Sequence, residues 1–156
     1  MSKSLARVKA ALEAAGEQAQ VLEMTETTRT AQDAAQAAGC EVDQIAKSII
    51  FRGEESGHVL LFLTAGGNRV DPDLASQVAG QPLGKADAAL IRAETGFAIG
   101  GVAPIGHLNP ITAFFDPRLS DFAQVWAAAG TPRHIFAIAP DRLLEITGSK
   151  PTVFVK

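Results

Sequence analysis

The sequence has almost no cysteine and no long hydrophobic run. Cys40 is the one cysteine among 156 residues, so no disulfide bond can form within the chain. The longest apolar run, VLLFLTA at residues 59–65, has the length of a strand and is far shorter than the roughly 20 residues that span a bilayer. The segment MSKSLARVKAALEAAG carries charges throughout and lacks the continuous apolar core of a secretory signal. We therefore expect a cytoplasmic protein that enters no membrane.

The sequence also has no excess of positive charge. The formal net charge is −3. It arises within residues 1–46, which carry four Lys or Arg against seven Asp or Glu, whereas residues 47–156 carry ten of each. This balance argues against the broad basic surface of a protein that binds duplex DNA. A small basic rim that contacts one end of a nucleic acid is still compatible with the charges.

Common motifs of catalytic and metal sites are absent. The histidines have no Cys or carboxylate at metal-ligand spacing, so we expect no metal site and no cofactor. No G-x-S-x-G sequence occurs. GQPLGKA, residues 80–86, has three residues between its glycines and Ala86 where a phosphate-binding loop has a hydroxyl, so we interpret it as a turn before a helix. Cys40 is interpreted as a buried or incidental thiol rather than a nucleophile.

The apolar residues are spaced with the periods of helices and strands. The stripe of Leu5, Val8 and Leu12 predicts a helix that Gly16 ends. Further helices are expected after Thr30, after Asp71, over residues 85–96 and after Pro140, and strands at residues 19–24, 46–53, 59–65, 111–116 and 134–139. Helices and strands do not strictly alternate, and several strands look hairpin-linked. The pattern predicts one α+β domain over residues 1–156, with a mixed, largely antiparallel sheet and surrounding helices.

Lys47 stands at the head of the apolar strand AKSIIFRG. Side chains alternate along a strand, so Lys47 shares a face with Ile45, Ile49 and Phe51. A lysine at a sheet edge can lay its stem over apolar surface and keep its ammonium in water. This interpretation agrees with the rule that lysine is rarely fully buried unless it is paired. Alternatively the ammonium belongs to a functional site. The strand by itself leaves both interpretations open.

The segment GFAIGGVAPIGHLNP, residues 96–110, has four glycines and two prolines in an otherwise apolar run. Glycine lets a ligand approach the main-chain N–H and C=O groups closely, and proline stiffens the turn. A stiff loop with accessible amides suits the binding of an oxyanion or a carbonyl group. The alternative is a tight bend between two core strands.

Four segments in order carry a resemblance to a known family: QIAKSIIF, HVLLFLTAG, ETGFAIGGVAPIGH and AAAGTPRHIFAIAPDRLLEITG. Together they resemble the aminoacyl-tRNA deacylases related to the editing insertion of prolyl-tRNA synthetase, the YbaK-like proteins. The similarity covers nearly the whole chain. It implies an α+β editing domain and a hydrolase that removes wrong amino acids from tRNA, most often from mischarged tRNA for proline.

The resemblance also implies roles for single residues. The strand lysine of the family matches Lys47. Its glycine-x-x-x-proline loop matches residues 100–104, which implies catalytic roles for Gly100 and Gly101 beside Lys47. Substrate-binding roles are implied for Val102, Ala103, Pro104 and the following Gly106. A histidine near the C-terminal strand lines the amino-acid pocket in such domains, and His134 is its match here; a surface histidine at the start of a strand is the alternative. His107 receives no role.

The reaction implied by the resemblance needs no protein nucleophile, because the ester of an aminoacyl-tRNA is already activated. The enzyme must position water, bind the carbonyl and exclude side chains of the wrong size, and the family uses groups of the substrate itself in place of a protein base. The loop from Gly100 to Pro104 can supply an oxyanion donor, worth about 3 kcal/mol, or hold the water through its carbonyls. Lys47 is expected to position the substrate; it acts as a base only if burial strongly lowers its pKa.

The expected substrate is tRNA for proline that carries Ala, Cys, Ser, Thr or 2-aminobutyrate, bound by its acceptor end. Selection of the tRNA then rests on that end, or on help from prolyl-tRNA synthetase or an elongation factor. The alternative function is a non-catalytic module of the same fold that binds aminoacyl-tRNA or a synthetase. An unrelated small-molecule binding domain would not explain the ordered motifs.

Overall fold

The computed structural model describes residues 2–25 and 30–156 of the chain. In this part of the chain, helices surround a single sheet of eight strands. The helices are α1 (Lys3–Ala14), α2 (Ala31–Ala38), α3 (Pro72–Ala79), α4 (Ala88–Thr95) and α5 (Pro140–Thr147), with the 3₁₀ helices η1 (Val42–Gln44) and η2 (Pro117–Asp121). The strands are β1 (Gln20–Glu23), β2 (Ile45–Gly53), β3 (Val59–Ala65), β4 (Leu83–Lys85), β5 (Thr112–Phe115), β6 (Val125–Thr131), β7 (His134–Ile138) and β8 (Lys150–Pro151).

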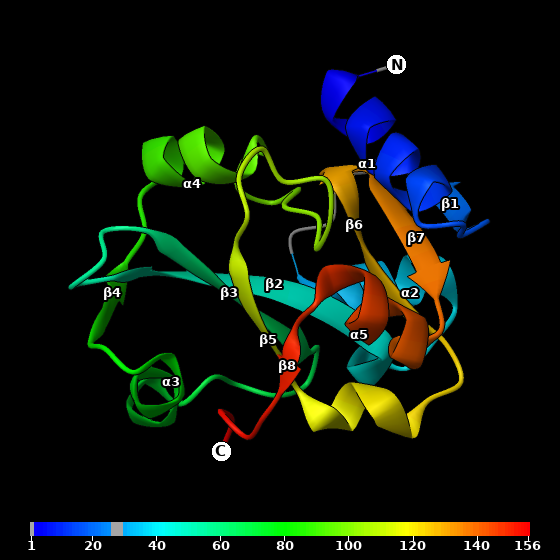
Figure 1. The fold of residues 1–156 in the computed structure, drawn as a ribbon. Helices are drawn as coiled ribbons and strands as arrows, with labels where there is room; N and C mark the ends of the chain where they lie inside the picture. The colour runs from blue at the N-terminus through cyan, green and yellow to red at the C-terminus, as the bar shows by residue number, and fades with distance from the viewer. Residues whose placement is uncertain (1, 26–29) are drawn as a thin grey trace.

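The sheet mixes parallel and antiparallel neighbours. Its strand order is β1-β7-β6-β2-β3-β5-β8, and β4 pairs with β2 outside this path (Figure 1). The pairs β1–β7, β7–β6, β2–β3 and β2–β4 are antiparallel, whereas β6–β2, β3–β5 and β5–β8 are parallel. The expected α+β fold with a mixed, largely antiparallel sheet is therefore confirmed.

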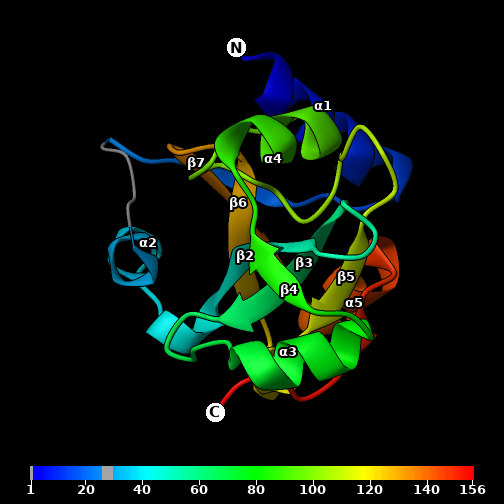
Figure 2. The same ribbon diagram turned by 90° about the vertical axis from the view of Figure 1, so that its left-hand side faces the viewer.

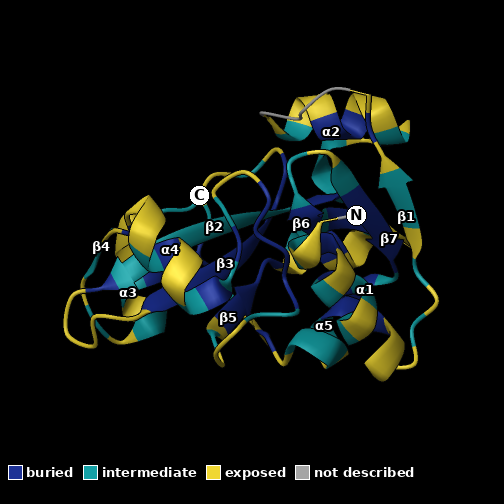
Figure 3. Cartoon of the chain, turned by 90° about the horizontal axis from the view of Figure 1, so that it is seen from above, coloured by how far each residue is buried: buried dark blue, intermediate teal, exposed yellow. Residues whose placement is uncertain are grey.

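Helices cover both faces of the sheet. On one face, α1, α4, α5 and the loop after α4 enclose the largest buried cluster, which includes Leu5, Leu61 and Phe115. On the other face, α2 and α3 cover two smaller clusters. Figure 2 shows α1 and α4 on one side of the sheet and α3 on the opposite side. In Figure 3 the strands between the helices are buried or half-buried, while the outward sides of α1, α2 and α4 are exposed. None of the described helices has the length and hydropathy to cross a membrane.

The helix ends largely follow the local sequence. The side chains of Thr30 and Asp71 accept hydrogen bonds from main-chain N–H groups of the first turns of α2 and α3. The prediction for residues 80–96 was partly wrong. Residues 83–85 form β4, because they pair with β2, and the helix begins only after Asp87, whose carboxylate accepts the N–H of Leu90. Pairing between distant segments overrode the local turn signal there.

Candidate active site

One edge of β2 carries two different strands with a gap between them. β6 pairs with Ile45 and Ala46, and β4 pairs with Phe51–Gly53, so residues 47–50 have no strand partner on that edge. On the opposite edge, β3 pairs with β2 without interruption from Ala46 to Arg52. A cleft of about 760 Å³ opens at the gap and is lined by residues of α2, β2, the turn after β3, α4 with its following loop, β6 and β7. The sheet itself therefore creates the cleft.

Main-chain groups of β2 point into this gap. The N–H of Gly53 donates to His58 of the hairpin loop at 2.9 Å, and the N–H of Glu54 donates to Pro82 on the β4 side at 2.9 Å. Because hydrogen bonding alternates along an antiparallel pair, odd-numbered residues of β2 bond to β3 and even-numbered residues face the gap. Ser48 lies in the stretch that has no strand partner on this edge, so its N–H and C=O groups, together with the N–H of Ile50, face the gap. They are available to a ligand in the cleft.

Lys47 lies between two apolar clusters on the face of the sheet covered by α2 and α3. Its neighbour Ile45 belongs to the cluster around Trp126, whereas Ile49 packs on the cluster around Phe62. The side chain of Lys47 is half-buried, and its Nζ donates to the main-chain oxygens of Gly66 at 3.2 Å and of the turn residue 68 at 2.6 Å. The ammonium is thus held by carbonyl groups at the wall of the cleft.

The ammonium keeps hydrogen-bonding capacity for a ligand. A lysine ammonium has three N–H donors, and two of them are used by the carbonyls of residues 66 and 68. Burial, followed by the charge of Arg69, lowers the pKa of Lys47, while the carboxylates of Asp116 and Asp43 act in the opposite direction. Arg69 is exposed and also lines the cleft, so two cations stand on this wall.

The Gly/Pro loop after α4 is fixed at both ends by one guanidinium. Arg7 of α1 donates from Nη2 to the carbonyl of Gly96 at 2.7 Å and from Nε to the carbonyl of Gly106 at 2.7 Å. The same guanidinium lies 4.5 Å from the ring centroid of Phe97. The planar fork of arginine suits two parallel donations of this kind. Sequence reasoning missed Arg7, because 89 and 99 residues separate it from its two acceptors.

The middle of the loop is held by side chains and by close packing. Ser48 donates to the carbonyl of Val102 at 2.9 Å, and His107 Nε2–H donates to the carbonyl of Ala103 at 2.7 Å. Burial lowers the pKa of His107. Gly101 packs against Thr131, where a Cβ atom would lie 2.8 Å from two main-chain atoms. Only glycine fits at that position without movement.

Apart from His134, the predicted site residues fall into three groups. Lys47, Gly100 and Val102 line the cleft. Gly101 and Ala103 are buried behind them. Pro104 and Gly106 instead line a second cavity of about 460 Å³ together with the unassigned His107 and the end of α5.

His134 lies at the start of β7. Its Nδ1 is 2.6 Å from Thr131 Oγ1, its Nε2 is 3.9 Å from a carboxylate oxygen of Glu23, and it is not among the described residues that line the cleft. A contact of His134 with the amino acid stays a prediction.

Other reactive groups do not gather at the cleft. Burial and the neighbouring Glu41 raise the pKa of the Cys40 thiol, which disfavours the thiolate. In residues 2–25 and 30–156, no group of three His, Cys, Asp or Glu side chains is placed to hold a metal ion. What the cleft offers is an ammonium, an exposed guanidinium, unpaired main-chain groups of β2 and apolar walls.

A family model and several known proteins match most of this chain. Residues 25–146 match the family described as the aminoacyl-tRNA editing domain. The uncharacterized protein YwhH of Bacillus subtilis (strain 168) is 31% identical over 130 residues, which cover 83% of this chain and 82% of YwhH. A crystal structure of a candidate trans-editing enzyme for prolyl tRNA synthetase is 45% identical with a TM-score of 0.93, covering 100% of this chain and 99% of that chain. The hypothetical protein APE2540 is 26% identical with a TM-score of 0.87, covering 96% and 99%.

Proposed function

This chain belongs to the aminoacyl-tRNA editing domain family, which confirms the resemblance to YbaK-like proteins, and from that premise we propose that it is a trans-editing aminoacyl-tRNA deacylase. The substrate would be mischarged tRNA, in the first instance tRNA for proline that carries Ala, Cys, Ser, Thr or 2-aminobutyrate. The observation that carries the proposal is the cleft at the gap in β2, where the ammonium of Lys47 meets unpaired main-chain groups.

The proposed reaction is hydrolysis of the aminoacyl ester. Water attacks the ester carbonyl carbon, the bond to the ribose oxygen breaks, and the products are the free amino acid and the free 3′ end of the tRNA. In this proposal the third N–H of Lys47 donates to the oxygen that becomes negative in this step. Lys47 then acts as a positioning and electrostatic group rather than as the base.

The loop from Gly100 to Pro104 can contribute donors more readily than acceptors. The carbonyls of Val102 and Ala103 already accept hydrogen bonds from Ser48 and His107. Their engagement favours oxyanion binding by N–H groups over the alternative in which loop carbonyls hold the water. In this proposal the N–H groups of Gly100 and Val102, on the cleft wall, complement those of β2.

The acceptor end of the tRNA is the proposed macromolecular contact. Lys47 and Arg69 place two cations on the cleft wall, which suits the terminal phosphates, and the exposed Ile99 offers an apolar surface beside Gly100. A contact limited to the acceptor end cannot by itself distinguish one tRNA from another, so a second protein must select the tRNA. Prolyl-tRNA synthetase or an elongation factor would supply that selection in the cytoplasm.

A panel of charged tRNAs tests this function. The protein is incubated with tRNA for proline that carries each of the five small amino acids, and ester loss is compared with the spontaneous rate. We expect accelerated loss for at least one of them. Differences of one methyl group alter transition-state binding by only about 1–3 kcal/mol, so activity on several is expected. Binding without accelerated loss for any member would instead support the non-catalytic module.

A further inference from the structure

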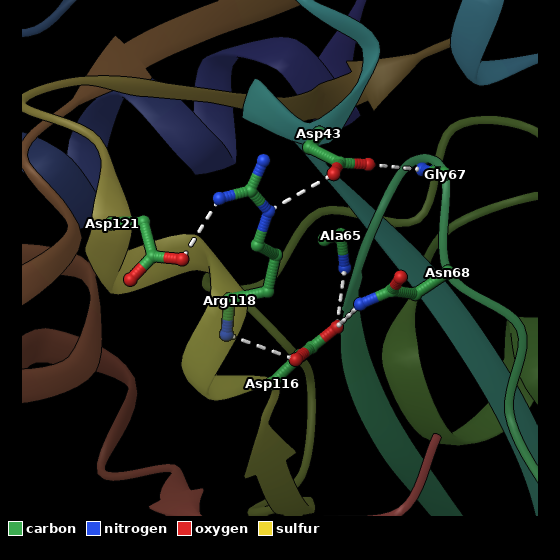
Figure 4. A network of polar contacts seen from close by, with 7 residues as sticks. All are labelled: Asp43, Ala65, Gly67, Asn68, Asp116, Arg118 and Asp121. Carbon is green, nitrogen blue, oxygen red and sulfur yellow. Dashed lines mark hydrogen bonds and ion pairs between the residues drawn. The ribbon is translucent and has the colours of Figure 1, made fainter. Parts of the chain in front are cut away.

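The two carbonyls that hold Lys47 belong to a single short turn. Residues 66–68 follow β3 directly, and the carbonyls of Gly66 and Asn68 both accept from Lys47 Nζ. The position of the ammonium in the cleft therefore depends on the position of this turn. Two carboxylates outside the cleft hold the turn in place, and Figure 4 shows them.

The first carboxylate is Asp116, which follows β5 and is only 2% exposed. Its Oδ2 accepts from the main-chain N–H of Ala65 at 3.1 Å and from the side-chain amide of Asn68 at 2.9 Å. Its Oδ1 accepts from the main-chain N–H of Arg118 at 3.0 Å. Asp116 thus joins the end of β3, the turn and the start of η2 by hydrogen bonds to a charged acceptor, which are stronger than neutral ones.

The second carboxylate is Asp43 of η1, which reaches the same turn from the opposite side. Its Oδ1 accepts from the main-chain N–H of Gly67 at 2.8 Å, and its Oδ2 accepts from Arg118 Nε at 3.0 Å. A Cβ at Gly66 would lie 2.2 Å from the carbonyl oxygen of Val42, so only glycine lets the turn approach η1 this closely. Asp43 and Asp116 therefore secure consecutive residues of one turn.

Arg118 connects the two carboxylates and also bonds to a third, exposed carboxylate. Its main-chain N–H bonds to Asp116, its Nε to Asp43, and its Nη1 donates to the exposed Asp121 at 2.8 Å (Figure 4). In the part of the chain that the structure describes, Asp121 bonds to Arg118 and has no hydrogen bond or ion pair with the turn or with Lys47. It provides a matched control, because it shares the same arginine but does not hold the turn.

We propose that Asp116 and Asp43 are positioning residues for Lys47, which act by fixing the carbonyls of the turn at residues 66–68. Neither carboxylate is among the described residues that line the cleft, so neither is assigned a contact with substrate. This proposal rests on the proposed function for one point, namely that Lys47 takes part in the deacylation. The position and the protonation of Lys47 can be measured without any turnover.

The first test is kinetic, with the aminoacyl-tRNA that the panel identifies as substrate. Asp43→Asn and Asp116→Asn should lower kcat by roughly 10- to 100-fold with a smaller change in KM, as expected when a group is displaced by about 1 Å. Asp121→Asn should keep kcat within about twofold. In a Lys47→Ala background, Asp43→Asn should lower kcat by less than about twofold, because Lys47 no longer transmits the effect of Asp43. Equal losses in both backgrounds, or an equal loss for Asp121→Asn, would overturn the proposal.

The second test uses protein labelled with ε-¹³C lysine, whose Lys47 resonance is assigned from the Lys47→Arg variant. Asp43 and Asp116 both favour the charged ammonium, while Arg69 opposes it. Removing either carboxylate should therefore lower the pKa of Lys47, and Asp121→Asn should leave it unchanged. Asp43→Asn keeps this test available if the buried Asp116→Asn variant does not fold. An unchanged Lys47 titration in a folded Asp43→Asn variant would refute the proposal even if no charged tRNA is hydrolysed.

Discussion

Lys47 shows how an ammonium can sit on an apolar face of a sheet. The residue lies where the clusters around Trp126 and Phe62 leave β2 uncovered, and two main-chain carbonyls replace part of its water shell. A charged group that loses water must be compensated by hydrogen bonds. The turn at residues 66–68 provides that compensation and leaves one donor for a ligand.

His107 gives a prediction about pH and stability. Burial places its folded-state pKa below the ordinary value of 6.5, so the unfolded chain binds the proton more tightly. The stability contributed by this residue is present above pH 6.5 and is lost as the pH falls through the folded-state pKa. His107→Gln keeps an N–H donor for Ala103 but does not titrate. Urea unfolding from pH 7.5 to 4.5 should show a shallower acid loss of stability in His107→Gln than in the unmodified protein; parallel curves would contradict this.

At the scale of elements, the loop from Gly96 to Gly106 depends on α1. Arg7→Lys removes the planar fork, and a single ammonium cannot reach both carbonyls with the same geometry. We expect a loss of about 1.5–3 kcal/mol in the free energy of unfolding, the range for a hydrogen bond to a charged group, together with a lower kcat for deacylation. Arg92→Lys on the exposed face of α4 is the control and should change neither quantity. Equal stability of both variants in urea unfolding would contradict the role of Arg7.

The packing of the loop on the β6–β7 hairpin gives a second prediction at this scale. Gly101→Ala places a Cβ 2.8 Å from main-chain atoms of Thr131, so the loop must move away from the hairpin. Overpacking of this kind costs about 1–3 kcal/mol, and turnover should fall because the wall of the cleft moves. Gly57→Ala, in the β2–β3 hairpin loop, strains a φ of 77° but meets no atom within 4 Å. The free energy of unfolding of Gly57→Ala should fall by about 1–2 kcal/mol, no more than in Gly101→Ala, and its turnover should be unchanged. Full turnover in Gly101→Ala would show that the loop position is not critical.

The elements were more predictable than the cleft. Thr30 and Asp71 mark helix starts through local chemistry, and the sequence displays such chemistry directly. The gap in β2 depends on the pairing of β6 and β4 with the same edge, which lies between segments distant in the sequence. Lys47 and the Gly100–Pro104 loop were therefore recognisable as candidates. The residues that hold them, such as Arg7, were not.

At the scale of the whole molecule, a net charge of −3 means that nucleic acid can be attracted only locally. Arg69 is the exposed cation beside Lys47 on the cleft wall. Arg69→Gln should raise KM for aminoacyl-tRNA with little change in kcat, and should reduce the slope of log affinity against log salt by about one unit. Arg52→Gln, outside the cleft and paired with Glu54, is the matched control and should leave the slope unchanged. An unchanged slope in both variants would place the tRNA elsewhere.

The central claim is that the cleft at the gap in β2 hydrolyses an aminoacyl ester with the help of Lys47. The most direct measurement is the deacylation rate of the preferred charged tRNA by the unmodified protein and by Lys47→Ala, with circular dichroism to verify the fold of the variant. We predict a rate well above spontaneous hydrolysis for the unmodified protein and a loss of at least roughly 100-fold in folded Lys47→Ala. A folded Lys47→Ala variant that turns over near the unmodified rate would contradict the claim.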